Sequence, residues 1–163
     1  YKNEVFMIKN EELDFSLNLI SERDLDNLRN WKNSNRASFH YKGMITPVMQ
    51  LSWYQKYLKR YGCNEDFMFM VKHSEVTVGC LGFRRKADSW DGYNVIRGVD
   101  VPATKGLMSR AFLESIELAW KIARLPFQVD VLNDNPAVVW YLKCGFKIVT
   151  KNELTTLLVK KFD

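Results

Sequence analysis

Hydrophobic and polar residues follow two regular patterns along this chain, and the patterns predict its strands and helices. In residues 15–20 apolar and polar side chains alternate, as they do in a strand with one buried face. In residues 105–123 apolar side chains recur every three or four positions, so they share one face of a helix. The expected strands cover residues 15–20, 67–72, 76–85, 95–101, 127–132, 146–149 and 154–159, and the expected helices cover residues 21–31, 47–62, 105–123 and 136–143.

Residues that start or stop secondary structure agree with most of these boundaries. Ser21, followed three positions later by Asp24, is typical of the first residue of a helix. Pro47 suits the first turn of a helix, where its missing N–H costs nothing. Asp91 and Gly92 predict a turn in the loop at residues 87–94.

The order of these elements, β-α-α-β-β-β-α-β-α-β-β, is typical of the α/β (α+β) class, with a mixed sheet flanked by helices. A chain of 163 residues fits one domain, and 47% hydrophobic residues suffice for a packed core. We therefore expect residues 1–163 to form a single domain whose core spans about residues 15–160.

The charge of the chain favours a small anionic ligand. The net charge is +5, but the basic residues are scattered and form no dense cluster of the kind that binds nucleic acid. No apolar run approaches the roughly 18 residues of a membrane span. We therefore expect neither a nucleic-acid partner nor a membrane partner.

The cysteines indicate reduced thiols. Cys63, Cys80 and Cys144 are odd in number and far apart, and they form no CxxC or Cys/His motif with His40 or His73. No metal site is therefore expected. Reduced thiols are typical of a cytoplasmic protein.

The segment at residues 99–109 combines the end of a strand, a short loop and the start of a helix. A helix start presents unpaired N–H groups and a positive dipole end, which suit a phosphate or pyrophosphate group. Gly106 would let such a ligand approach the backbone closely. A glycine near a helix start is also common without any ligand, so this segment alone leaves both interpretations open.

A second segment carries a resemblance to a known family. Asn135, Ala137, Tyr141, Gly145 and Phe146 occupy the positions of the pattern Asn-x-Ala-x-x-x-Tyr-x-x-x-Gly-Phe. The chain thereby resembles the GNAT superfamily of N-acetyltransferases. The resemblance extends over nearly the whole chain and agrees with the element order read from the periodicity.

The pyrophosphate loop of that family corresponds to residues 103–108. Gly106 fits the first glycine of the loop, whereas Ala103 and Met108 depart from its pattern. Lys105 can replace the phosphate contact that is lost at Ala103. The residues at 105–109, 28–32 and 53–54 resemble the branch that contains ribosomal-protein N-terminal acetyltransferases and nucleotide-amino-sugar N-acetyltransferases.

The resemblance implies a mostly antiparallel sheet of about seven strands with about four helices, in which the strands at 95–101 and 127–132 splay apart. Acetyl-CoA would lie in the gap as cosubstrate, and a backbone N–H of the first strand would polarise the thioester carbonyl. The cofactor contacts implied in this way are Val99, Val101, Thr104, Lys105, Gly106, Leu107, Met108, Ser109, Asn135 and Tyr141.

By the same resemblance, Tyr141 would be the general acid toward the CoA thiolate in a direct transfer. Free phenol and thiol pKa values of about 10 and 8.5 make full proton transfer uphill by roughly 2 kcal/mol, so a strong hydrogen bond is the better description. Candidates for the base that takes the amine proton are His40 and Asp100, with Asp91 and Glu65 as alternatives.

The residues leave the acceptor open between a protein N-terminus and a small amine such as a nucleotide-linked amino sugar. A monomer and a homodimer are both compatible with the sequence. The alternative function is a GNAT-fold module that senses acyl-CoA without turnover, as the irregular loop at residues 103–108 would allow. Residues expected near the acceptor are the basic Lys42, Lys56, Lys59 and Arg60 and the aromatic Tyr41, Trp53 and Trp90.

Overall fold

The computed structural model describes residues 7–100, 102 and 106–162, and an eight-stranded sheet forms its centre. The strand order is β1-β2-β3-β4-β5-β6-β8-β7, and all neighbours are antiparallel except β5 and β6. The strands are β1 Met7–Asn10, β2 Phe15–Leu19, β3 Asp66–His73, β4 Val76–Arg85, β5 Trp90–Arg97, β6 Phe127–Leu132, β7 Lys147–Lys151 and β8 Thr155–Lys160.

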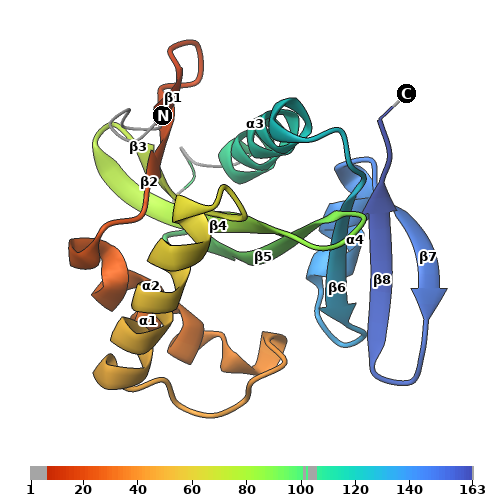
Figure 1. The fold of residues 1–163 in the computed structure, drawn as a ribbon, viewed down its shortest axis with the longest axis horizontal. Helices are drawn as coiled ribbons and strands as arrows, with labels where there is room; N and C mark the ends of the chain where they lie inside the picture. Colours follow the sequence, from red (N-terminus) through yellow and green to blue (C-terminus); the bar gives the residue numbers. More distant parts are fainter. Residues whose placement is uncertain (1–6, 101, 103–105, 163) are drawn as a thin grey trace.

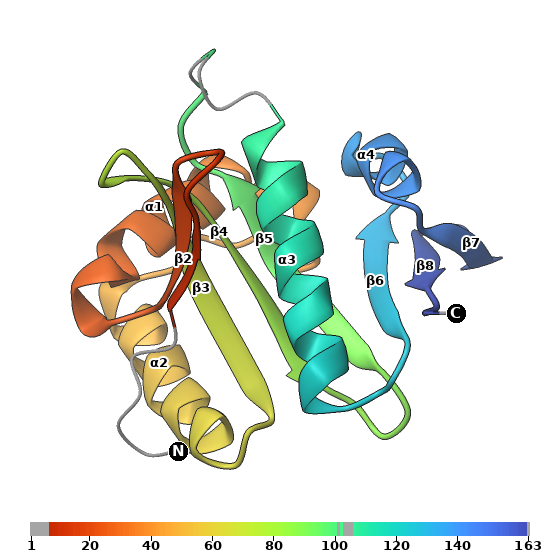
Figure 2. The same cartoon turned by 90° about the horizontal axis from the view of Figure 1, so that it is seen from above.

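Helices cover both faces of the sheet (Figures 1 and 2). α3 lies on one face, α1 and α2 lie on the other, and α4 lies beyond the end of β6. Their bounds are α1 Leu25–Ser34, α2 Pro47–Gly62, α3 Leu107–Ile122 and α4 Ala137–Lys143, with short 3-10 turns η1 Glu22–Asp24 and η2 Arg36–Ser38.

The hydrophobic core has a part on each face of the sheet. Under α3, Phe112 packs edge-on against Phe127 with ring centroids 5.7 Å apart, and Phe83 packs against the same ring at 6.0 Å. On the other face, Leu28 of α1 and Tyr57 of α2 are buried against β3 and β4. Aromatic packing of this kind holds α3 against the middle strands.

The sheet opens between its two parallel strands. β5 and β6 pair only at Trp90 with Phe127 and at Asp91 with Gln128, and no further pair follows in the described residues. Beyond this point β5 carries a bulge, because Asn94 and its successor together oppose a single residue of β4 and Asn94 has a φ of 50°. The bulge therefore lies in the part of β5 that no longer pairs with β6.

The α/β fold class with a mixed, mostly antiparallel sheet is confirmed. β4 and β6 have the expected bounds, and α2 begins at Pro47 and ends at Gly62 as expected. Ser21 also behaves as expected, since its backbone N–H donates to Asp24 Oδ2 at 2.8 Å. This bond first produces the η1 turn, and α1 follows from Leu25.

The prediction for β5 was wrong. The strand expected at residues 95–101 is Trp90–Arg97, and Asp91 and Gly92 lie within it instead of in a turn. The turn precedes the strand, where Lys86 N donates to Ser89 O at 2.8 Å. The first residue of β5 is a tryptophan with no exposed surface, so burial of its side chain decides where the strand begins.

Two further differences concern the ends of the chain and of α3. The sheet has eight strands because β1 pairs with β2 in a hairpin that the sequence pattern missed. α3 begins at Leu107, and residue 105, where it was expected to start, lies outside the described residues. Among the described residues no helix is both long and apolar enough to cross a membrane.

Candidate active site

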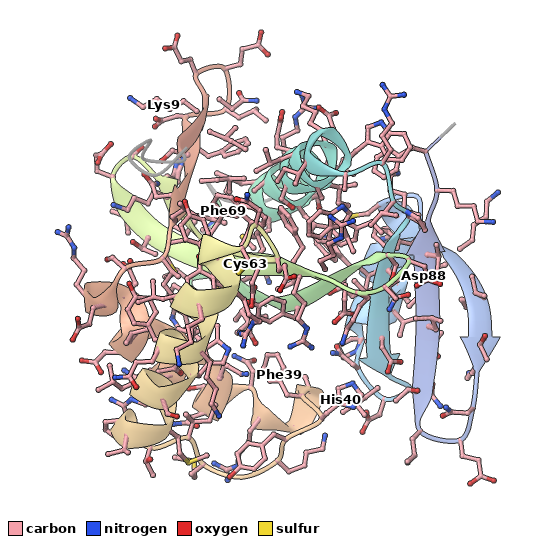
Figure 3. All side chains as sticks on the ribbon, viewed as in Figure 1. Lys9, Phe39, His40, Cys63, Phe69 and Asp88 are labelled. Carbon is pink, nitrogen blue, oxygen red and sulfur yellow. The ribbon has the colours of Figure 1, made fainter. Side chains whose placement is uncertain are left out.

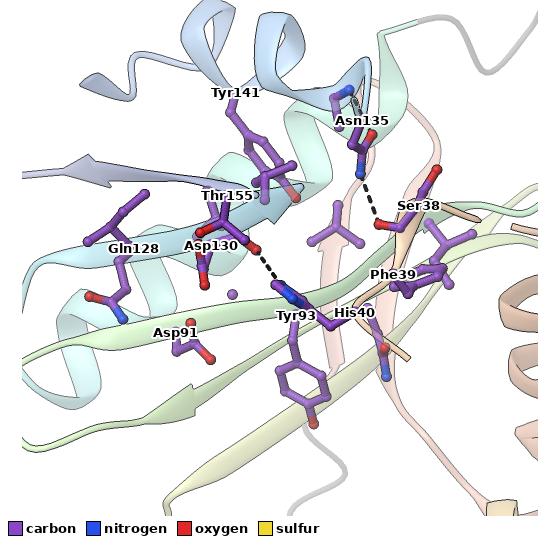
Figure 4. Close-up of a pocket in the computed structure, with 18 of the residues that line it drawn as sticks. Ser38, Phe39, His40, Asp91, Tyr93, Gln128, Asp130, Asn135, Tyr141 and Thr155 are labelled. Atoms are coloured by element: carbon purple, nitrogen blue, oxygen red, sulfur yellow. Dashed lines mark hydrogen bonds between the residues drawn. The ribbon is translucent and has the colours of Figure 1, made fainter. Parts of the chain in front are cut away.

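A cavity of about 1250 Å³ lies where β5 and β6 separate (Figure 4). Its walls come from β5, β6, the hairpin of β7 and β8, the start of α4 and the loop after α1. Figure 2 shows the start of α3 and α4 at the end of the sheet where the two strands have separated. The cavity therefore occupies the gap in which the sequence resemblance would place a thioester cosubstrate.

Tyr141 lines the cavity from α4 and is 7% exposed (Figure 4). Its ring is held by Phe112, Trp140 and Phe146, with centroids 5.7, 5.1 and 5.7 Å away. Burial raises the pKa of the phenol, so Tyr141 stays protonated across the physiological pH range. Within the described residues the hydroxyl makes no hydrogen bond, which leaves its proton free for a ligand.

α4 has only seven residues, so its surroundings must hold it in place. Asn135 Oδ1 accepts a hydrogen bond from Ala137 N at 2.9 Å, which satisfies one of the free donors at the helix start. The Trp140 indole N–H donates to Ser109 Oγ at 2.8 Å and thereby ties α4 to the first turn of α3. These bonds fix the direction in which Tyr141 points.

The loop after α1 is tied across the cavity to β6 and α4. Asn135 Nδ2 donates to Ser38 O at 3.2 Å, and His40 Nε2 lies 3.3 Å from Asp130 O. Figure 3 shows Phe39 and His40 on this loop, and Figure 4 shows both hydrogen bonds. A carbonyl oxygen only accepts, so Nε2 carries the hydrogen and Nδ1 of the neutral ring keeps its lone pair.

Of the three carboxylates expected as bases, the structure places one at the cavity and two outside it. Asp91 lines the cavity but is 8% exposed and pairs with Arg84 Nε at 3.1 Å. Asp100 is exposed, pairs with Arg97 at 3.5 Å and does not line the cavity, and Glu65 does not line it either. Of the expected bases, His40 is therefore the one that faces the cavity without an ion-pair partner in the described chain.

The start of α3 offers main-chain groups and open space. Gly106 has a φ of 78°, a conformation that glycine adopts readily, and a Cβ built there would contact none of the described residues within 4 Å. The side chains of Leu107 and Met108 are buried in the core. The hydroxyl of Ser109 is engaged by Trp140, so ligand contacts here would come from the backbone amides.

Other expected cofactor contacts lie beyond the end of β5. Val99 follows the strand, and its N–H donates to Val78 O at 2.9 Å, so this amide is not free to polarise a carbonyl. The side chain of Val99 packs against the core. Val101, Thr104 and Lys105 lie outside the described residues.

The residues expected near the acceptor lie in different places. Tyr41 and Trp53 line the cavity, whereas Trp90 is fully buried in the core. None of the four expected basic residues lines the cavity, and Arg60 instead pairs with buried Asp66 at 2.7 Å. The basic side chains that do line it are Lys32, Arg84, Lys86 and Arg97.

Sequence reasoning missed the polar positions of β6. Gln128 and Asp130 line the cavity and alternate with two valines of the same strand, as Figure 4 shows for the two polar side chains. The alternation itself was visible in the sequence and could have identified this polar face. The bulge residue Asn94 also lines the cavity, and no local sequence pattern marked it.

A scan against models of protein families found no match, and a search of curated proteins found none either. Solved structures do match over most of the chain, at low sequence identity. The chain has the GNAT acetyltransferase fold.

Three of these structures show the range of the fold. RimL, an α-N-protein acetyltransferase of a ribosomal protein in complex with CoA, has a TM-score of 0.77 and 11% identity over 92% of this chain and 95% of its own. FdhC, a nucleotide-linked sugar GNAT, has a TM-score of 0.74 and 15% identity over 91% and 86%. Spermidine N-acetyltransferase from Vibrio cholerae, with CoA and spermine, has a TM-score of 0.69 and 17% identity over 90% and 95%.

Proposed function

We propose that this protein is an N-acetyltransferase that transfers an acetyl group from acetyl-CoA directly to a primary amine. The observation that carries the proposal is the position of Tyr141, whose protonated phenol faces a cavity between two diverging strands. Neighbours of the same fold, RimL and spermidine N-acetyltransferase, were solved with CoA, which supports the choice of cosubstrate.

The residues present fit such a cosubstrate. Past Asp91, β5 pairs with no strand of the described chain on its β6 side, so an extended amide-bearing chain can add to that edge. Among the described residues the space beside Gly106 is open and the first amides of α3 have no hydrogen-bond partner, which suits a pyrophosphate group. When bound, acetyl-CoA would supply an activated acetyl group as a thioester.

Tyr141 would act on the sulfur side of the transfer. The amine nitrogen bonds to the acetyl carbon, the carbon–sulfur bond breaks, and the sulfur leaves with negative charge. The Tyr141 hydroxyl would donate a hydrogen bond to that sulfur. Because burial raises the pKa of the phenol, full proton transfer is harder than in water, and the final proton on sulfur would come from solvent.

His40 would act on the amine side of the transfer. The attacking amine must lose a proton, and the free Nδ1 lone pair of His40 is positioned on the loop that covers the cavity. A protein N-terminus needs little help, since its amine is partly neutral at pH 7. We expect a His40→Gln variant to lose rate mainly below about pH 8, where the amine is protonated, in a pH profile of kcat/KM.

The test of the function measures CoA release with a panel of primary amines, beside CoA binding by calorimetry. A Tyr141→Phe variant should bind CoA as the unaltered protein does but release it about 100-fold more slowly. Tyr61→Phe is the matched control, because Tyr61 lies on α2 and does not line the cavity.

The outcomes separate the candidate functions. No binding of CoA would refute the proposal. Binding of CoA with no turnover of any amine would favour the acyl-CoA sensor. Turnover that is unchanged in Tyr141→Phe would leave an acetyltransferase but remove Tyr141 from its chemistry.

A further inference from the structure

A small side pocket adjoins the main cavity beside the bulge of β5. Its volume is about 160 Å³, and Lys32, Tyr41, Trp53 and Asn94 line both it and the main cavity. Gln50 of α2 lines the side pocket but not the main cavity. A ligand in the main cavity can therefore extend a small group into the side pocket.

The side-chain oxygen of Gln50 has no partner among the described residues. The residue is 4% exposed, and its Oε1 atom is fully buried with no hydrogen bond. Buried polar atoms in proteins nearly always have a partner, because an unpaired one is costly. Rotation about the last side-chain bond exchanges the oxygen and the NH2 group, so Gln50 can offer either an acceptor or a donor to a ligand.

Lys32 brings a positive charge to the same pocket. It is half-buried, lies 5.2 Å from the centre of the Phe39 ring and forms no ion pair within the described residues. Burial is the main cause that lowers the pKa of its ammonium group; Cys80 opposes this shift, and the nearby Arg84 adds to it. A partly buried ammonium group loses hydration, and no described carboxylate compensates for this loss, so an anionic ligand would be favourable there.

The charges around the main cavity point the same way. Four basic and two acidic side chains line it among the described residues. Arg84 is paired with Asp91, and Arg97 is paired with an aspartate outside the cavity. In the described residues Lys32 and Lys86 remain without an acidic partner and Asp130 remains without a basic one, so the unpaired charge is still positive and the cavity favours an anion over a polycation such as a polyamine.

We propose that the acceptor is an amine that also bears an anionic group, a carboxylate or a phosphate, and that Lys32 and Gln50 hold this group in the side pocket. The ammonium of Lys32 pairs with the anion, and the Gln50 NH2 group donates a hydrogen bond to it. The amine of the same molecule then lies in the main cavity near the gap between β5 and β6. This inference rests on the proposed function, because it names the substrate class of that site.

The test is a titration of the CoA-saturated protein with sodium phosphate and, separately, with sodium acetate, followed by NMR. Saturation with CoA keeps the added anions away from the start of α3. The reporters are the carboxamide signals of Gln50 and the indole N–H signal of Trp53, which both belong to the side pocket. We expect saturable shifts with at least one of the two anions. The anion that binds more tightly shows whether the side pocket prefers a phosphate or a carboxylate group.

The variants make the result decisive. Lys32→Met should weaken binding of the anion about tenfold or more, and Lys32→Arg should restore much of the lost affinity. Lys59→Met is the matched control, because Lys59 is exposed on α2 and lines neither cavity. Among amines that the protein acetylates, the kcat/KM preference for an amine with an anion over the same amine without it should fall by a similar factor in Lys32→Met.

Two results would overturn the inference. One is the absence of saturable shifts with either anion, and the other is equal binding in the unaltered protein and in Lys32→Met. Both can occur in a protein that binds CoA and acetylates neutral amines, so they leave the proposed function standing. A protein that fails to bind CoA fails the proposed function instead, and the anion titration of the free protein still reports on the side pocket.

Discussion

Asn135 joins the two halves of the candidate site, and two substitutions of it should have different effects. Its Oδ1 accepts from Ala137 N at 2.9 Å at the start of α4, and its Nδ2 donates to Ser38 O at 3.2 Å in the loop after α1. Asn135→Ala removes both bonds. Asn135→Asp keeps the acceptor at the start of α4 and loses the donor to the loop.

The magnitudes follow from the type of each bond. An acceptor at a helix start contributes about 1 kcal/mol, and a neutral side-chain hydrogen bond contributes about 1 kcal/mol. Asn135→Ala should therefore lower the free energy of unfolding by about 2 kcal/mol, which is a fall in Tm of about 4–8 °C. Asn135→Asp should lose about half as much, because a carboxylate at a helix start also interacts well with the helix dipole.

Urea denaturation measures the stability, and CoA release with a primary amine measures the site. In Asn135→Asp, α4 and Tyr141 should keep their positions while the loop loosens, so KM for the amine should rise more than kcat falls. Asn10→Ala is the matched control, because its Oδ1 accepts a hydrogen bond from Leu13 N at 3.1 Å in the turn between β1 and β2 and Asn10 does not line the cavity. Equal losses of stability in the two Asn135 variants would refute this division of roles.

Two further predictions concern the half-buried Lys32 and Gly98, which follows β5. Lys32→Met should raise Tm at neutral pH, because burial lowers the pKa of Lys32 and the charged form therefore weakens the folded state. Above the unfolded-state pKa of about 10.5, Lys32 is neutral in both states and costs the folded protein nothing. As the pH falls through the lowered pKa of the folded state, the group becomes charged and this stability is lost. The higher Tm of Lys32→Met should therefore disappear in melts above about pH 10.5. Gly98→Ala should lower stability by about 1–3 kcal/mol in urea denaturation, since the new Cβ would lie 2.1 Å from the Trp31 ring, and an unchanged midpoint would contradict this packing.

Most of the fold could be predicted because its signals are local. The alternation in β6 and the helical spacing in α3 each reflect one buried face, and such patterns fix an element before any tertiary contact is known. The error at β5 had a tertiary cause. Trp90 is fully buried by residues distant in sequence, and this burial outweighs the turn preference of Asp91 and Gly92.

The candidate site also contains residues that a local motif predicts and residues that only the folded structure brings together. Tyr141 and Asn135 belong to one contiguous motif, and the resemblance of that motif to the GNAT pattern suggested a shared role. The wall of the side pocket includes Lys32, Gln50 and Asn94, which come from α1, α2 and β5 and meet only after folding. Nothing in the local sequence distinguishes Lys32 from the other lysines, and only the folded structure shows that no described carboxylate pairs with it.

The two hydrogen bonds across the cavity bear on how acceptor and cosubstrate would be coupled. The loop that carries Ser38 and His40 also carries Tyr41 of the side pocket, and it is tied to the same Asn135 that holds α4. A group that settles in the side pocket would therefore favour one position of this loop. That position also places the His40 ring over the gap that Tyr141 faces. Acceptor recognition and alignment of the reacting groups would then depend on one short segment, which is why its tether at Asn135 should affect KM before it affects kcat.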